Sequence, residues 1–246
     1  MAGPAIRALR LATVCVALAA SASGGGVLAL DRQKALTQFV LDSWQMEDGL
    51  PQSAVHAIVQ SRDGFLWAGT EEGLVRFDGT GFKVYDTSNT PGLRNDHIWA
   101  LAEDRDGTLW IGTYGGGLTH MRDGAFTALT TKEGLPSDSV RTLYADRSGA
   151  TWVGTDGGGL ARVEGGRVTA FTTREGLPHD RVNAIVEDGG GALWVGTDDG
   201  GLARLEEGRF HADPARHRLH QEDVNALHVD RSGALWVGTD GGLARF

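Results

Sequence analysis

The chain has 246 residues, a formal net charge of −9, 41% hydrophobic residues and 37 glycines. This hydrophobic content is that of a globular chain, and so much glycine indicates many turns. The acidic balance argues against a nucleic-acid partner, because phosphate binding requires clustered lysine and arginine. It mainly favours solubility.

The first 29 residues are typical of a secretory signal peptide. Two arginines are their only charged residues, and an apolar run at 11–20 follows. That run has the length of a signal-peptide core and is too short to cross a bilayer. Small residues at 20–22 and 27–29 offer two cleavage sites. We favour the second site, which leaves residues 30–246 as the exported chain.

Cysteine usage agrees with this interpretation. Cys15 is the single cysteine and lies inside the apolar run. The exported chain would therefore contain no disulfide and no thiolate metal site. No later apolar run is long enough for a membrane anchor, so we expect an exported chain without one.

Five near-copies of the phrase Leu-Trp-Val-Gly-Thr dominate the remaining sequence. Their tryptophans recur every 42 or 43 residues, at Trp67, Trp110, Trp152, Trp194 and Trp236. A fixed period of about 40–45 residues marks a repeat architecture. We expect the tryptophan and the Gly-Thr pair to serve packing between repeats, since a buried indole supplies a large apolar surface.

The third unit shows what one repeat should form. Residues 140–144, 151–155, 160–163 and 168–172 alternate apolar and polar side chains between glycine-containing turns. Alternation with β-branched and aromatic members predicts strands. Four short antiparallel strands per unit make one blade of a β-propeller, whose faces are buried only when blades stack.

The sequence therefore predicts an all-β fold, a five-bladed β-propeller of four-stranded antiparallel blades. The blades should span about 55–86, 98–130, 140–172, 182–212 and 224–246. The last unit ends before a fourth strand, whereas residues 39–44 stand where a fourth strand occurs in other units. We expect 39–44 to complete the last blade and close the ring, since closure removes exposed strand edges. The alternative is a piece of a longer propeller with an open end.

At Gly176–Pro178, Val182–Ile185 and Asp188–Arg204 the chain resembles the two-component regulator propeller repeat. The resemblance covers residues 30–246. It implies the periplasmic, ligand-sensing region of a bacterial hybrid histidine kinase or diguanylate cyclase, with a small-molecule or oligosaccharide ligand and possible self-association in a receptor dimer. No residues match a kinase or cyclase, so we expect no enzymatic activity and no cofactor in this chain.

Candidate ligand-binding residues lie where the repeats differ. The second position of each blade's first strand varies most and contains His56, Trp99, Arg141, Asn183 and Asn225. Acidic residues precede these strands at Asp96, Asp138 and Asp180, and a further polar set follows each Gly-Thr, at Glu71, Tyr114, Asp156, Asp198 and Asp240. Two alternatives remain open. The aspartates could bond backbone in their own turns, and the varying residues could pack between blades.

Histidines 211, 217, 220 and 228 gather around the irregular link before the last unit. Their spacing fits no usual metal motif, so we expect a solvated loop and no metal site. Two other functions stay open beside sensing. One is an exported carbohydrate-binding or carbohydrate-active propeller of the lectin or lyase type, and the other is a protein-interaction scaffold.

Overall fold

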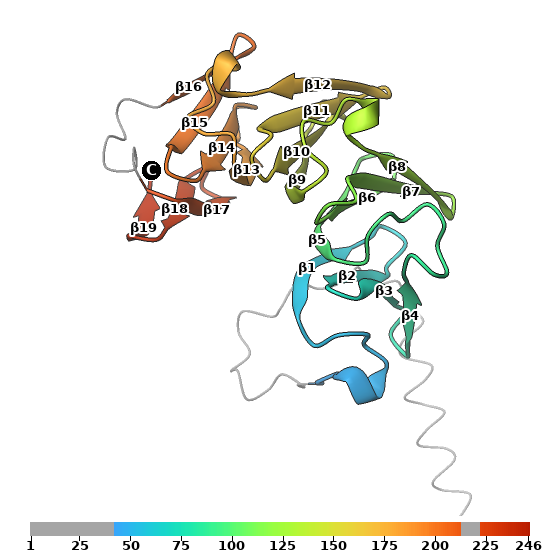
Figure 1. Cartoon of the computed structure of the whole chain (residues 1–246). Coiled ribbons are helices and arrows are strands. Elements are labelled where there is room, and N and C mark those ends of the chain that lie inside the picture. The colour runs from blue at the N-terminus through green and yellow to red at the C-terminus, as the bar shows by residue number, and fades with distance from the viewer. Residues whose placement is uncertain (1–41, 213–221) are drawn as a thin grey trace, which may run out of the picture. The chain divides into compact units, whose positions relative to one another are not determined.

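The computed structural model describes residues 42–212 and 222–246. All the described strands belong to one compact unit, Trp44–Phe246, and form five antiparallel sheets that follow one another along the chain (Figure 1). The signal peptide expected at 1–29 and half of the closing strand expected at 39–44, residues 39–41, lie outside the described residues. Within the described ranges, no helix is long and apolar enough to cross a membrane.

Four of the sheets contain four strands in chain order, and we name the sheets blades 1 to 5. Blade 1 contains β1 (Val55–Gln60), β2 (Leu66–Thr70), β3 (Gly73–Phe77) and β4 (Phe82–Tyr85). Blade 2 contains β5 (Ile98–Glu103), β6 (Leu109–Thr113), β7 (Leu118–Arg122) and β8 (Ala125–Leu129). Blade 3 contains β9 (Val140–Ala145), β10 (Thr151–Thr155), β11 (Leu160–Glu164) and β12 (Arg167–Phe171).

The last two blades differ in strand number. Blade 4 contains β13 (Val182–Glu187), β14 (Leu193–Thr197), β15 (Gly201–Glu206) and β16 (Arg209–Ala212). Among the described residues, blade 5 contains three strands, β17 (Val224–Val229), β18 (Leu235–Thr239) and β19 (Gly242–Arg245). The predicted all-β fold of antiparallel blades is thus confirmed, with five propeller-like sheets of three or four strands.

An aspartate in the first hairpin of blade 2 shows why the repeat keeps its Asp and Trp. Asp104 Oδ1 accepts hydrogen bonds from the turn amides of Asp106 and Thr108 at 2.9 and 3.0 Å. Its Oδ2 accepts from Trp110 Nε1 at 2.9 Å. One carboxylate therefore closes the turn and orients the indole. The same bond to tryptophan recurs from Asp146, Asp188 and Asp230, and Ser61 takes this place in blade 1.

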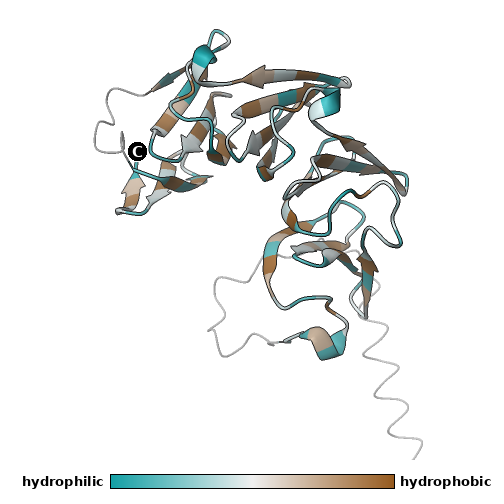
Figure 2. Ribbon diagram, viewed as in Figure 1, coloured by the Kyte–Doolittle hydropathy of each residue, from teal (hydrophilic) through white to brown (hydrophobic). Residues whose placement is uncertain are grey.

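Blades pack on one another through the second strand of one and the first strand of the next. Each of four hydrophobic clusters spans one junction, and Figure 2 shows hydrophobic residues concentrated in the strands. The glycine of the repeated phrase permits the close approach. A Cβ added to Gly154 would lie 2.7 Å from Val182 Cγ1, and one added to Gly112 would lie 2.5 Å from Val140 Cγ1. These glycines are therefore architectural, as the sequence predicted.

Short 3-10 helices carry the chain from one blade to the next. In η3 (Thr131–Glu133), Thr130 and Glu133 form a capping box, and Gly134 ends the turn in the left-handed region at φ 102°. Leu135 then inserts into the junction and is 3% exposed. η4 (Thr173–Glu175) repeats this design, and η2 (Met46–Asp48) begins the same way before blade 1. The Gly-Leu-Pro link is thus a turn followed by a buried anchor.

The two end blades each leave a face that other blades bury. Val55, Ile58 and Leu66 of blade 1 are exposed, and so are Leu243 and Phe246 at the other end. Residues 42–44 form no strand. A closing strand at 39–44 stays a prediction.

Candidate functional site

The first strands of successive blades adjoin one another, β1 beside β5, β5 beside β9, β9 beside β13, and β13 beside β17 (Figure 1). Their variable second residues meet the residues that follow each Gly-Thr. We name this group the inner-strand cluster. It contains His56, Glu71, His97, Trp99, Tyr114, Arg141, Asp156, Arg181, Asn183, Asp198, Asn225 and Asp240.

Within each blade, the varying strand residue pairs with the residue after Gly-Thr. Asn183 Nδ2 donates to Asp198 Oδ1 at 2.5 Å, and Asn225 Nδ2 donates to Asp240 Oδ1 at 2.6 Å. The other three blades pair His56 with Glu71 at 3.5 Å, Trp99 with Tyr114 at a 5.7 Å ring separation, and Arg141 with Asp156 at 3.8 Å. The second residue of the first strand and the residue after Gly-Thr thus meet in every blade, although a hairpin separates them in sequence. The geometry of the pair recurs, and its residue types vary.

Arg181 joins blades 3 and 4 in the charged part of the cluster. Its Nε donates to Asp156 Oδ1 and its Nη1 to Asp198 Oδ2, both at 2.6 Å. Burial tends to raise the pKa of Asp198, but hydrogen bonds from Asn183 and Arg181 outweigh it and hold that pKa below its ordinary value. Asp198 is therefore a carboxylate at neutral pH.

The part of the cluster from blades 1 and 2 is aromatic. The rings of His56 and His97 stack on Trp99 at centroid distances of 5.2 and 5.1 Å. Tyr114 lies 5.7 Å from Trp99, and the guanidinium of Arg141 lies 6.0 Å from the same indole ring. Arg141 therefore links the aromatic part to the charged part, at a distance consistent with cation–π attraction.

The three predicted aspartates before the inner strands have structural partners. Asp96 Oδ1 accepts from Thr87 N at 2.7 Å, and Asp138 Oδ1 accepts from Thr131 N at 2.7 Å. Asp180 does the same with Thr173 N at 2.8 Å. Each carboxylate thus holds the link that leads into its strand. A contact with ligand by these three residues stays a prediction.

Sequence reasoning missed His97 and Arg181, each of which contacts an acidic residue of the preceding blade. Both stand directly before an inner strand, where the five repeats read Ala54, His97, Ser139, Arg181 and Asp223. This position varies as much as the one that was singled out. Comparing the repeats two residues earlier would have found both.

Two buried polar atoms in the cluster have no hydrogen-bond partner among the described residues. They are the acceptor Asn183 Oδ1 and the ring nitrogen His97 Nε2. Buried polar atoms are nearly always paired in folded proteins, so an atom without a partner needs an explanation such as a bound water, ion or ligand. Both atoms belong to residues whose other contacts face the cluster.

The absence of metal ligands stays a prediction, and the structure brings three potential ligands together. His56, Glu71 and His97 each bring one potential ligand atom within 4.8 Å of the others. The spacing along the chain gave no hint, because the three residues lie far apart in sequence and in two blades. Of the histidines considered before the last unit, His217 and His220 lie outside the described residues.

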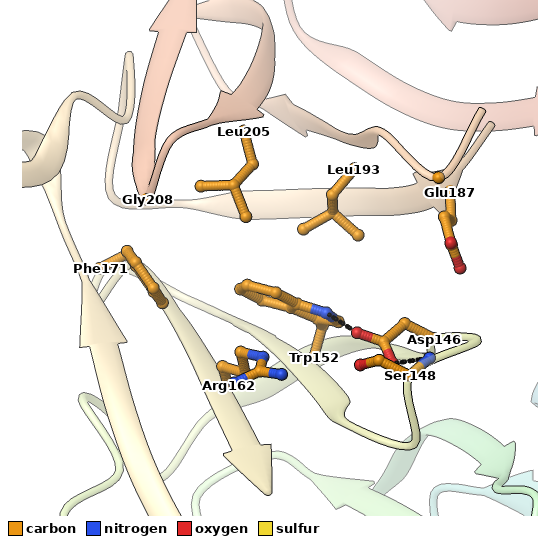
Figure 3. Close-up of a pocket in the computed structure, with 10 residues that line it drawn as sticks. Asp146, Ser148, Trp152, Arg162, Phe171, Glu187, Leu193, Leu205 and Gly208 are labelled. Carbon is orange, nitrogen blue, oxygen red and sulfur yellow. Dashed lines mark hydrogen bonds between the residues drawn. The ribbon is translucent and has the colours of Figure 1, made fainter.

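A separate cleft of about 420 Å³ opens between blades 3 and 4 (Figure 3). The indole of Trp152 lies in it, bonded to Asp146 at 2.8 Å, with Leu193 and Leu205 across from the ring. Burial tends to raise the pKa of Asp146, but hydrogen bonds from Ser148, Trp152 and turn amides lower it overall. This cleft contains the repeated Asp–Trp pair, whereas the varying residues lie in the inner-strand cluster.

The repeats match a known family model, described as Two component regulator propeller. The matches cover residues 49–72, 92–115, 134–157, 176–199 and 218–241. A 58-residue stretch is also 45% identical to Histidine kinase P4 of Formosa agariphila, covering 24% of this chain and 4% of that protein. The chain therefore spans a small part of that relative.

Solved structures with the same fold include extracellular domains from B. thetaiotaomicron. One is that of BT3049, assigned to a hybrid two component system, with TM-score 0.69, 24% identity and coverage of 78% of this chain and 27% of that one. Another is that of BT4673, with TM-score 0.66, 23% identity and coverage of 78% and 29%. Virginiamycin B lyase from Staphylococcus aureus has TM-score 0.59, 15% identity and coverage of 80% and 71%. At these identities the likeness shows the fold alone.

Proposed function

Because the chain belongs to the two component regulator propeller family, we propose that it is a periplasmic ligand-sensing propeller of a two-component-type receptor. The described residues form only propeller-like sheets, with no kinase or cyclase domain among them. Signalling output would then come from another part of the receptor. A receptor of this kind would relay ligand binding through self-association of its propellers.

The inner-strand cluster is the observation that supports a binding role. Five blades agree on their turns and their packing, yet they present four different pairs at the same two positions, with asparagine and aspartate shared by blades 4 and 5. Packing alone would keep these pairs alike, since the backbone around them is repeated. A surface with repeated geometry and varied chemistry suits recognition of one particular ligand.

The chemistry of the cluster favours a small polar ligand or an oligosaccharide. Trp99 and Tyr114 offer aromatic surface, and Asn183 Oδ1 offers a buried acceptor without a partner. Arg181, Asp156 and Asp198 add charged hydrogen-bonding groups beside them. Such a mixture of flat apolar faces and a few polar groups is typical of small-molecule sites.

A thermal-shift screen tests this proposal. The purified chain is heated with single oligosaccharides in the presence of EDTA, so that bound metal contributes nothing. A ligand at about 100 times its Kd adds roughly 2.7 kcal/mol to the free energy of unfolding. Asn183→Ala and Trp99→Ala should abolish the shift, whereas Arg167→Ala on the outer strand of blade 3 should keep it. A shift that survives both cluster variants would contradict the proposal, and so would no shift with any ligand.

The proposed location rests on residues 1–29. Fused to a phosphatase that is active only outside the cytoplasm, this segment should give active enzyme in a bacterial host. Replacing two residues of the apolar run with arginine should abolish that activity, because a charged core no longer enters the export pathway as an apolar segment. Equal activity from both fusions would contradict export by this segment.

We propose further that residues 39–44 complete blade 5. Trp44 packs on Phe77 and Phe82 of blade 1 at ring distances of 5.0 and 6.2 Å. Phe171, which ends the outer strand of blade 3, contacts Phe210 of blade 4 in the same way at 5.6 Å. Trp44 therefore occupies the place of an outer-strand terminus from a preceding blade. In a closed ring that preceding blade is blade 5.

In each recurring junction, the first valine or isoleucine of a blade packs on the Gly-Thr glycine of the preceding blade. Ring closure would bring Val55 of blade 1 against Gly238 of blade 5 in the same way. Val55 is 39% exposed, whereas Val182 is fully buried against Gly154. Val55→Cys and Gly238→Cys, introduced with Cys15→Ser, should form a disulfide within one chain, because the junction brings these backbones close. Non-reducing electrophoresis and peptide mass spectrometry detect it. Disulfides only between chains, or free thiols, would favour an open end that another blade covers.

A further inference from the structure

We propose that His56, Glu71 and His97 bind a divalent transition-metal ion of the zinc class. His56 Nε2 lies 3.5 Å from Glu71 Oε1, and His97 Nε2 lies 4.0 Å from the same oxygen. One ligand atom from each residue lies within 4.8 Å of the other two. The three side chains come from two neighbouring blades, so the site exists only when blades 1 and 2 are packed together.

The donor set and its dimensions suit such an ion. Zinc binds imidazole nitrogen and carboxylate oxygen at about 2.0–2.2 Å, which places ligand atoms of a tetrahedral ion roughly 3.3 Å apart. The observed separations of 3.5 and 4.0 Å need only a small contraction by side-chain rotation. Two histidines and one carboxylate leave a coordination position for water or for a ligand group.

The surroundings orient the three groups toward one point. Both imidazole rings stack on Trp99, at 5.2 and 5.1 Å. Gln52 Nε2 donates to Glu71 Oε2 at 3.4 Å, which leaves Oε1 directed at both histidines. Outer groups that hold metal ligands in position strengthen binding.

A plain histidine–glutamate ion pair accounts for the geometry less well. In that case His97 Nε2 would approach Glu71 to hydrogen-bonding distance, yet it is buried and unpaired. At the equivalent positions of blades 4 and 5 the two side chains are in direct contact, since Asn183 and Asn225 donate hydrogen bonds to their aspartates at 2.5 and 2.6 Å. In blades 1 and 2 the two histidine Nε2 atoms instead lie 3.5 and 4.0 Å from Glu71 Oε1, and one potential ligand atom of each residue lies within 4.8 Å of the other two.

Metal titration of the purified full chain tests the site, with Zn²⁺ followed by calorimetry and Co²⁺ followed by its visible absorption. We expect one high-affinity equivalent and a Co²⁺ spectrum of low coordination number. His97→Ala and Glu71→Gln should weaken binding by more than the roughly 10–100-fold typical of losing an outer-shell partner. His228→Ala, which removes an exposed histidine of blade 5, should bind like the parent.

Circular dichroism and melting without metal establish that each variant folds, and Glu71→Gln keeps the shape of a half-exposed side chain. Absence of the high-affinity equivalent in the parent would overturn the inference. Equal binding by folded Glu71→Gln and the parent would overturn it as well. The sensing proposal is tested in EDTA, so failure of one proposal leaves the other standing.

Discussion

The five blades share some positions and differ at others, and both kinds lie in the same sheets. They have different roles. The shared aspartate, tryptophan and glycine close turns and let blades touch, as at Asp104, Trp110 and Gly112. The inner-strand cluster places histidine, arginine or asparagine on a repeated backbone, where one set makes a charged network and another brings three potential metal-ligand atoms within 4.8 Å of one another. A repeat can thus change its surface chemistry while its packing stays constant.

If shared positions carry stability, filling a junction glycine should have the largest effect. In Gly154→Ala the new Cβ meets Thr142 and Val182 at 2.5 and 2.7 Å, within a fully buried junction. We expect the free energy of unfolding to fall by about 1–3 kcal/mol from overpacking, measured by urea unfolding.

Gly189→Ala is the matched control, because a Cβ added there would meet nothing within 4 Å. We expect little change in stability. Equal losses from the two variants would contradict a junction role for Gly154.

Removing the turn carboxylate should have the next largest effect. Asp104→Ala deletes the acceptor for two turn amides and for the indole of Trp110. We expect a loss of about 1–3 kcal/mol, since the buried donor is left unpaired. Asp106→Ala removes an exposed carboxylate from the same turn and should change unfolding little. Similar losses in both variants would show that charge, rather than the bond to tryptophan, matters.

Lowering the pH should change the free energy of unfolding by a smaller amount, through the equivalent turn carboxylates of blades 3 and 4. Asp146 and Asp188 have pKa values below the ordinary one in the folded state. A depressed pKa adds stability above the unfolded value of about 3.9, and this stability is lost as pH falls through the folded value. The free energy of unfolding should therefore decline below about pH 4, less steeply in Asp146→Asn than in the parent. The same pH dependence in Asp146→Asn and in the parent would contradict a contribution from the lowered pKa of Asp146.

Variants of the charged part of the cluster should have the smallest effect on stability. Arg181 bridges Asp156 and Asp198, but its side chain is 45% exposed. Exposed ion pairs contribute about 0–1 kcal/mol, so Arg181→Ala should unfold almost like the parent, and like Arg174→Ala. If Arg181→Ala lowered the free energy of unfolding as much as Gly154→Ala, varied positions would contribute to stability as much as shared ones, which would contradict this comparison.

Most of the fold could be predicted because it depends on local and repeated signals. Turn glycines such as Gly149, at φ 96°, and alternating strands such as Val140–Ala145 specify structure within a few residues. The candidate site could be predicted only in part. His56 and Arg141 were found because their position differs among repeats, whereas His97 lies two residues before that position and was missed.

By itself, the sequence determined the repeat, the antiparallel blades and the family, because the period and the turn chemistry are properties of neighbouring residues. Only the tertiary structure decided which varying side chains meet. Glu71 directly follows a strand of blade 1 and His97 precedes a strand of blade 2, and packing of the two blades brings them to 4.0 Å. Contacts between blades depend on how sheets stack, and no spacing within one repeat encodes that distance.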